Sequence, residues 1–126
     1  MSPGPRTVGD SLRVMADDCV FCKIVAGEIP ARRVYEDEDT VAFADLNPQA
    51  PTHVLVVPKR HIADIVELSK DAEAGAALLR GIRGTAEASG LTEFRTVFNT
   101  GAQSGQSVFH VHAHVLGGRR MLWPPG

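Results

Sequence analysis

Three of the chain's five histidines stand at alternate positions near its C-terminal end, as His110, His112 and His114. Neutral imidazole is a competent nucleophile near neutral pH, because its ordinary pKa is about 6.5. One imidazole can attack phosphorus, and its neighbours can orient it, hold a proton or bind phosphate oxygens. The alternative is a structural metal cluster or a set of solvated surface histidines. Three imidazoles together, following a Gly-x-Ser segment, favour the chemical interpretation.

The alternation of these histidines predicts the element that positions them. Successive side chains of a β-strand point to opposite faces, so the three imidazoles share one face. A helix would scatter them and leave no coherent apolar face. The opposite face of the strand is apolar and suited to burial: Phe109, Val111, Ala113 and Val115.

Polar groups from three segments are candidates for holding a nucleotide beside these histidines. Gly105, Gln106 and Ser107 lead into the histidine strand, and glycine lets backbone N–H groups approach a phosphate closely. Asn99 ends the preceding predicted strand and could donate to the same phosphate. Asp45 ends an earlier strand and could accept from ribose hydroxyls. The structural alternatives are a Gly-Ser turn, a turn-forming asparagine and a capping aspartate.

Cys19 and Cys22 form a Cys-x-x-Cys pair, the spacing of a zinc knuckle. A four-coordinate site needs two more ligands. His53 opens one predicted strand and His110 opens the histidine strand, so neighbouring strands would complete a Cys2His2 site. Two thiolates would neutralise the charge of Zn²⁺. The alternatives are a buried reduced pair, an adventitious disulfide and a thioredoxin-like redox pair.

Bulk properties exclude several classes of protein. A chain of 126 residues is about one domain, and its 44% hydrophobic content is ordinary for a globular protein. A net charge of −2 gives no basic surface for nucleic acid. No apolar run approaches the roughly 18 residues of a membrane span, and no secretory signal is present. We therefore expect a cytoplasmic protein that binds neither nucleic acid nor membrane.

The chain divides into an extension and one domain. Residues 1–17 carry Pro, Gly and Ser without a period, which predicts a disordered N-terminal extension, with Met15 a candidate for the natural start. Residues 18–126 form the domain, with a tail over 117–126. Helices are predicted over about 19–26, near 62–68 and over about 71–88. Strands are predicted over 32–35, 40–45, 52–58 and 94–100 and in the histidine segment. This order predicts an α+β fold, with about five mostly antiparallel strands and two main helices.

The long helix has a predicted inward stripe and contains three glycines, one of them in that stripe. Gly81 and Gly84 weaken the helix, but they allow close approach of another element, such as a second subunit. The stripe that faces the core is predicted to be Gly75, Leu78, Leu79, Ile82, Thr85 and Ala86.

The sequence resembles the histidine triad (HIT) family over about residues 18–126. The family motif His-φ-His-φ-His-φ-φ, in which φ is apolar, stands here as HVHAHVL at 110–116. Further resemblance lies in FCKI at 21–24, EIP at 28–30, PQAPTH at 48–53, PK at 58–59, HI at 61–62 and GQS at 105–107. The ending WPPG at 123–126 resembles the Hint branch, the purine nucleoside phosphoramidases, here combined with a zinc-type cysteine pair.

This resemblance implies a homodimer with one continuous ten-stranded sheet and hydrolysis of purine nucleoside 5′-phosphoramidates, such as AMP-amine, AMP-lysine or GMP conjugates. It makes His112 the nucleophile, which forms a nucleotidyl-histidine intermediate. His114 and Asn99 contact the α-phosphate. Ser107 contacts phosphate or helps to protonate the leaving amine. Asp45 takes the ribose.

Further residues are implied by the same resemblance. The backbone near Gly105 and Gln106 helps to hold the phosphate, and Trp123 from the partner's tail borders the site. Family members with both cysteines carry structural zinc that the chemistry does not require, and its ligands map onto Cys19, Cys22, His53 and His110. The apolar base slot maps onto Val20, Phe21, Ile24, Ile29, Phe43 and Leu46.

Two other functions stay open at this point. The first is hydrolysis of dinucleoside polyphosphates or another nucleotidyl hydrolase or transferase activity of the same family, against which the short Hint-like tail argues. The second is a nucleotide- or zinc-binding regulatory module. The sequence does not choose between adenine and guanine, because Ala44 stands where some relatives carry a larger residue.

Overall fold

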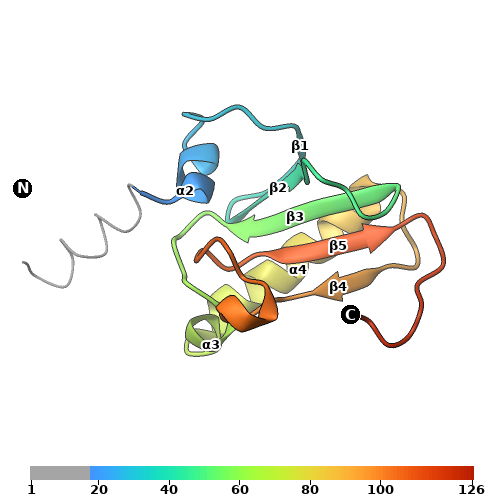
Figure 1. Ribbon diagram of the computed structural model, residues 1–126. Coiled ribbons are helices and arrows are strands. Elements are labelled where there is room, and N and C mark those ends of the chain that lie inside the picture. Colours follow the sequence, from blue (N-terminus) through green and yellow to red (C-terminus); the bar gives the residue numbers. More distant parts are fainter. Residues whose placement is uncertain (1–17) are drawn as a thin grey trace, which may run out of the picture.

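The computed structural model describes residues 18–126 (Figure 1). The predicted N-terminal extension, including Met15, lies outside the described residues. Within them, no helix combines the length and apolarity that a membrane crossing needs. The helices are α2 (Val20–Val25), α3 (Ile65–Leu68) and α4 (Ala72–Ala88), with a 3-10 turn η1 (Ala102–Ser104). The strands are β1 (Arg33–Glu36), β2 (Thr40–Ala44), β3 (Thr52–Pro58), β4 (Arg95–Val97) and β5 (Ala113–Gly117).

The five strands form one sheet in the order β1-β2-β3-β5-β4, and every neighbouring pair is antiparallel. The predicted α+β class and five-stranded antiparallel sheet are therefore confirmed. Residues 18–126 contain three helices, of which α3 is a single turn. Figure 1 shows α4 running along one face of the sheet.

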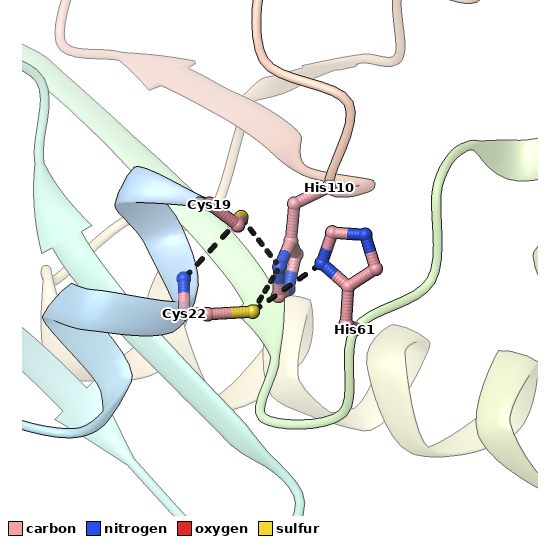
Figure 2. A group of neighbouring side chains, drawn as sticks. All are labelled: Cys19, Cys22, His61 and His110. Carbon is pink, nitrogen blue, oxygen red and sulfur yellow. Dashed lines mark hydrogen bonds between the residues drawn. The ribbon is translucent and has the colours of Figure 1, made fainter. Parts of the chain in front are cut away.

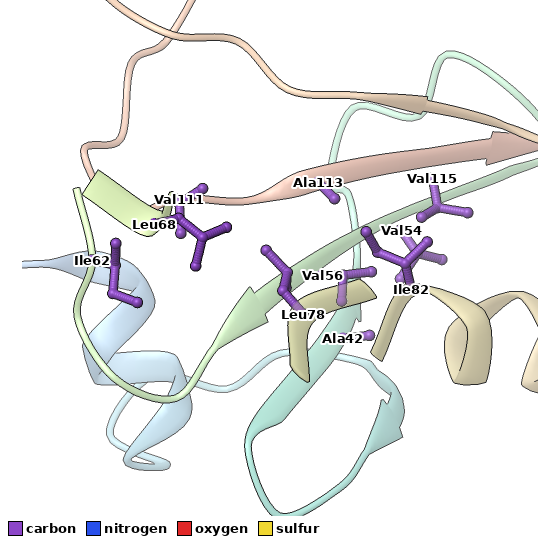
Figure 3. Packing of buried hydrophobic residues seen from close by; sticks show 10 residues of the cluster. All are labelled: Ala42, Val54, Val56, Ile62, Leu68, Leu78, Ile82, Val111, Ala113 and Val115. Carbon is purple, nitrogen blue, oxygen red and sulfur yellow. The ribbon is translucent and has the colours of Figure 1, made fainter. Parts of the chain in front are cut away.

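Two apolar clusters lie on the two faces of the sheet, because the strands alternate their side chains. On the α4 face, Val54 and Val56 of β3 pack with Leu78 and Ile82 of α4 (Figure 3). On the other face, Leu55 and Val57 pack with the segment that contains α2. The buried members of this second cluster are Cys19, Phe21, Ile24, Val41, Phe43, Leu55 and Val57. The α2 segment is thus held against the face opposite α4.

Helix α4 begins and ends with recognisable caps. The Asp71 carboxylate accepts a hydrogen bond from Ala74 N at 3.0 Å, and Gly90 follows the end with a φ of 70°. The prediction that Leu79 faces the core is wrong, since its side chain is 65% exposed, and Gly81 is buried instead.

Two of the three glycines of α4, Gly81 and Gly84, allow close approach of the sheet, which corrects the suggestion of a second subunit at this place. A Cβ at Gly81 would collide with Thr40 of β2. A Cβ at Gly84 would collide with the ring of Tyr35 of β1. The absence of side chains here lets the helix lie directly on the sheet.

The histidine segment keeps the predicted alternation, although regular pairing begins only at Ala113. Val111 and Ala113 are buried in the α4 cluster, and the three histidines point to the other side. Val111 N donates to Ile62 O at 2.6 Å, so this stretch contacts the loop beyond β3 rather than a strand. Burial of Phe109 was wrongly predicted: its side chain is 48% exposed, because the chain there still belongs to the preceding loop.

Candidate functional site

Two cysteines and two histidines converge between α2 and the start of β5 (Figure 2). Cys19 caps α2, and its Sγ accepts from Cys22 N at 3.4 Å. The Nδ1 atom of His110 lies 3.4 Å from each of the two sulfurs. His61, in the loop after β3, places its Nδ1 3.3 Å from the Sγ of Cys22. All four ligand atoms lie within 4.8 Å of one another.

The buried ring of His110 is prepared as a ligand by its backbone contact. Its Nε2 lies 2.8 Å from the carbonyl oxygen of Pro58, which can only accept, so Nε2 carries the hydrogen. The lone pair therefore lies on Nδ1, which faces the sulfurs. Burial lowers the pKa of His110 to about 4, so the ring stays neutral.

The spacing of these four atoms fits a tetrahedral metal ion such as zinc. With Zn–S bonds of about 2.3 Å and Zn–N bonds of about 2.0 Å, neighbouring S and N ligands lie roughly 3.5 Å apart. The sulfur–nitrogen separations of 3.3 and 3.4 Å match this geometry. Neutral imidazole and thiolate are also the donor types that zinc prefers.

The sequence predicted His53 as the fourth ligand, and this prediction is wrong. The side chain that lies beside Cys19, Cys22 and His110 is His61. His53 lies near the start of β3, whereas His110 contacts Pro58 at the end of that strand. Five residues of extended strand separate His53 from Pro58 by about 17 Å. Only Lys59 and Arg60 separate His61 from Pro58, so the loop after β3 brings His61 to the cysteines.

His112 sits beside this cluster with a fixed orientation. Its Nδ1 lies 2.8 Å from the carbonyl oxygen of His110, so Nδ1 donates and the lone pair lies on Nε2. The edge-on contact with Phe21 has a centroid separation of 5.0 Å and an interplanar angle of 88°. The side chain is 9% exposed. His112 thus offers one oriented nucleophilic nitrogen.

His114, the first histidine inside regular β5, joins a second polar group with His53 and Asp45. Its Nδ1 lies 2.9 Å from His53 Nε2 and 4.0 Å from Asp45 Oδ2. The same carboxylate oxygen lies 3.4 Å from His53 Nε2. Burial lowers the pKa of His114, and the nearby rings of His112 and His53 lower it further. The lowered pKa favours the neutral form of the His114 ring.

The loop before the histidines is braced by a buried side chain. The Gln106 amide accepts from Gly101 N at 2.9 Å and donates to Ala63 O and Val108 O at 2.9 and 3.1 Å. The backbone N–H groups of Gly105 and Gln106 donate to Ala102 O and Gly101 O. The two backbone N–H groups that the family resemblance assigned to phosphate therefore already donate to carbonyl oxygens within the loop.

Of the other predicted polar residues, Ser107 is exposed and Asn99 lies against the loop. The Nδ2 atom of Asn99 is 3.6 Å from the position that a Cβ on Gly105 would take. Ser107 lines a hollow together with Cys19, His61 and Phe109, and Asn99 stays beside the glycine loop.

The predicted apolar slot is brought together in part. Phe21, Ile24 and Phe43 are buried in one cluster, and Ile29 packs against it. Val108, which the sequence reading missed, packs there too. Two members lie elsewhere: Val20 is 38% and Leu46 101% exposed.

Trp123 lies on the β4 side of the sheet. Its ring centroid is 6.0 Å from the guanidinium carbon of Arg95, a residue of β4, and the side chain is 81% exposed. Arg95 also donates to the backbone oxygen of Leu122 at 3.0 Å. The C-terminal tail is therefore fixed to β4, and the indole ring is open to solvent or to another chain.

Comparison with known proteins gives a consistent result. A family profile described as HIT domain matches residues 26–121. An uncharacterized HIT-like protein of Synechococcus elongatus is 49% identical over 114 residues, which cover 89% of this chain and 100% of that protein. Protein HitA of Neisseria gonorrhoeae is 46% identical over 104 residues, 80% of this chain and 96% of that protein.

Solved structures extend the comparison to three dimensions. A HIT family hydrolase from Legionella pneumophila Philadelphia 1 has a TM-score of 0.81 and 51% identity, covering 86% of this chain and 100% of that chain. A histidine triad protein from Clostridium difficile has a TM-score of 0.78 and 42% identity, covering 83% of this chain and 94% of that chain.

Proposed function

Because the chain belongs to the HIT domain family, we propose that it hydrolyses the P–N bond of purine nucleoside 5′-phosphoramidates. The substrates are AMP or GMP joined through nitrogen to an amine such as lysine. The observation that carries the proposal is the oriented lone pair on His112 Nε2, which the bond from Nδ1 to the His110 carbonyl provides. A nucleophile that is also a good leaving group suits a two-step displacement at phosphorus.

In the first step, His112 Nε2 attacks the α-phosphorus and the P–N bond breaks. The amine leaves after it takes up a proton, for which the Ser107 hydroxyl is the proposed path. In the second step, water attacks phosphorus and returns one proton to the Ser107 hydroxyl, the bond from phosphorus to Nε2 breaks, and the nucleoside monophosphate leaves. The nucleotidyl-imidazole is cationic, and the His110 carbonyl stabilises it through Nδ1–H.

The rest of the proposed site holds the nucleotide. His114 and Asn99 donate to the phosphate oxygens, and Asp45 accepts from the ribose. The purine lies against the apolar cluster on the α2 side, formed by Phe21, Ile24, Ile29, Phe43 and Val108.

We further propose that Cys19, Cys22, His61 and His110 hold a structural zinc ion. When bound, zinc supplies a cross-link between the α2 segment and the sheet. Since His110 also receives the Nδ1–H bond of His112, the site stabilises the backbone that orients the nucleophile. No step of the hydrolysis passes through the metal.

We also propose a homodimer in which two sheets join through β4, because β4 is an edge strand with an apolar groove beside it. In the described residues β4 pairs with β5 alone and forms an edge of the sheet. A shallow apolar groove lies beside it, between α3, α4 and the residue that follows β4. Its apolar lining comprises Ile65, Leu68, Ala72, Leu78, Leu79 and Phe98. A second copy on this surface would extend the sheet to ten strands and bring its Trp123 near the first site.

The test compares His112→Ala with the unaltered protein on an AMP-amine substrate. Loss of the nucleophile should lower kcat by roughly 10⁴-fold or more. Rapid quenching of the unaltered protein should show AMP attached to His112 by mass spectrometry. Equal turnover by the variant contradicts the proposal. Faster turnover of a diadenosine polyphosphate than of the phosphoramidate would favour the related hydrolase activity, and nucleotide binding without turnover would favour a regulatory module.

A further inference from the structure

We propose that His53 is a positioning residue, which fixes the proton of His114 on Nε2 and so keeps that nitrogen a donor to phosphate. The inference rests on the proposed function, because it assigns a role within that site. His53 is 8% exposed and is not needed for the metal cluster, where His61 supplies the fourth ligand. Its own contacts therefore need another explanation.

The ring of His53 contacts the loop that precedes β3. Gln49 N lies 3.0 Å from His53 Nδ1, and a backbone N–H can only donate. Nδ1 of His53 must therefore carry a lone pair. In the neutral ring the hydrogen is then on Nε2. A backbone amide from the loop thus selects the tautomer of a side chain that reaches the site.

The tautomer of His53 in turn determines the tautomer of His114. His53 Nε2 lies 2.9 Å from His114 Nδ1, so the N–H of His53 donates and His114 Nδ1 accepts. The neutral ring of His114 then carries its hydrogen on Nε2. His112 and His114, whose ring centroids are 5.1 Å apart, therefore differ at the same atom. Nε2 of His112 offers a lone pair to phosphorus, and Nε2 of His114 offers a proton to oxygen.

The position of Asp45 explains why His114 needs the His53 ring to keep its hydrogen on Nε2. Its Oδ1 accepts from Asn47 N at 2.8 Å, which holds the carboxylate in place. Its Oδ2 lies 4.0 Å from His114 Nδ1. Without His53, this carboxylate would draw the hydrogen of His114 to Nδ1. A lone pair on Nε2 would then face the phosphate oxygens and repel them.

The same contacts argue against a second metal site, although Asp45, His53 and His114 place their ligand atoms within 4.8 Å of one another. A metal ligand must present a lone pair on His53 Nε2. The amide of Gln49 already uses the lone pair on Nδ1. A neutral imidazole has one lone pair of this kind, so the hydrogen-bonded chain is favoured over a bound cation.

The experiment compares His53→Gln with His53→Leu. The glutamine amide retains an N–H donor for His114, and leucine removes it. For an AMP-amine substrate, His53→Leu should lower kcat by up to roughly 10²–10³-fold, which is the cost of losing one hydrogen-bond donor to an oxyanion. His53→Gln should recover most of this loss. In both variants KM should change less than kcat, because the donor acts most strongly on charge that develops in the transition state.

Nitrogen NMR of labelled histidine gives a readout that does not depend on turnover. In the unaltered protein and in His53→Gln, His114 should carry its hydrogen on Nε2, and in His53→Leu the hydrogen should move toward Nδ1. Signals are assigned with His114→Gln. A hydrogen on Nδ1 of His114 in the unaltered protein would overturn the proposal, even if no phosphoramidase activity were found. Equal losses of kcat in both His53 variants, or a second metal equivalent lost with His53→Gln, would also overturn it.

Discussion

Backbone groups decide which nitrogen carries a hydrogen in His53, His110 and His112. The Pro58 carbonyl fixes Nε2–H on His110, and the His110 carbonyl fixes Nδ1–H on His112. The Gln49 amide fixes a lone pair on Nδ1 of His53. These partners cannot change roles, because an amide only donates and a carbonyl only accepts. Imidazoles of one residue type can therefore perform different tasks within a small volume.

At the residue scale, the metal ligands can be tested directly. His61→Asn and Cys22→Ser should each weaken zinc binding by more than the roughly 10–100-fold that loss of an outer-shell partner costs. His53→Gln is the matched control, because it changes a buried histidine outside the cluster. Metal content after dialysis against a competing chelator measures the effect. Zinc lost with His53→Gln but retained with His61→Asn would restore the ligand set expected from sequence.

At the element scale, the strands followed from local patterns, but the contacts between distant segments did not. Alternation correctly assigned Val111, Ala113 and Val115 to the core. The choice between His53 and His61 needed the antiparallel register of β3 and β5. Val56 pairs with Ala113, so the chain before Ala113 passes the end of β3, where His61 follows. A sequence shows that a strand exists more readily than it shows which other segments lie beside the ends of that strand.

The residues of α4 that face the core were also predicted only in part, because their burial depends on the neighbouring sheet. Leu79 is apolar and has helical spacing, yet it is 65% exposed in the chain. Gly81 is buried because the sheet approaches the helix there, which hydropathy cannot indicate. Apolar residues at interfaces and small residues at close contacts both depend on the neighbouring surface.

A pair of glycine substitutions in α4 tests this packing. Gly75→Ala should stabilise the protein by up to about 1 kcal/mol, since alanine favours the helix and no described atom lies within 4 Å of the new methyl group. Gly81→Ala should destabilise it by about 1–3 kcal/mol, because its Cβ would overlap Thr40. Urea unfolding at one protein concentration measures both. Equal stabilisation by both changes would contradict the close contact.

At the scale of the whole molecule, buried imidazoles predict a loss of stability in acid. Burial lowers the pKa of His110 to about 4 and also lowers the pKa values of His61 and His114. The unfolded chain takes up protons near pH 6.5, whereas the folded chain resists them. The free energy of unfolding of the metal-free protein is therefore fully present above pH 6.5 and falls as the pH drops toward 4.

His110 alone should contribute about 3 kcal/mol of this fall, from a shift of its pKa from 6.5 to about 4. Urea unfolding in the presence of a chelator, repeated between pH 7.5 and about pH 4.5, measures it. Zinc should flatten the dependence near neutral pH, since a bound metal holds its ligands deprotonated. A constant free energy of unfolding over this range in the metal-free protein would contradict the buried, neutral state of these rings.

The proposed dimer can be tested by changing one exposed side chain of the apolar groove. Leu79 is exposed and lines the apolar groove beside the β4 edge, so Leu79→Asp should leave the single chain folded and disrupt the proposed dimer. Val66→Asp is the matched control, because Val66 is 54% exposed on α3 and lies outside the groove lining. Light scattering should give twice the chain mass of 13.5 kDa for the unaltered protein and the control, and a single chain for Leu79→Asp. If the partner's Trp123 borders each site, phosphoramidate turnover should fall with the dimer and follow protein concentration. A single-chain mass for the unaltered protein, or equal effects of the two variants, would exclude this surface as the interface.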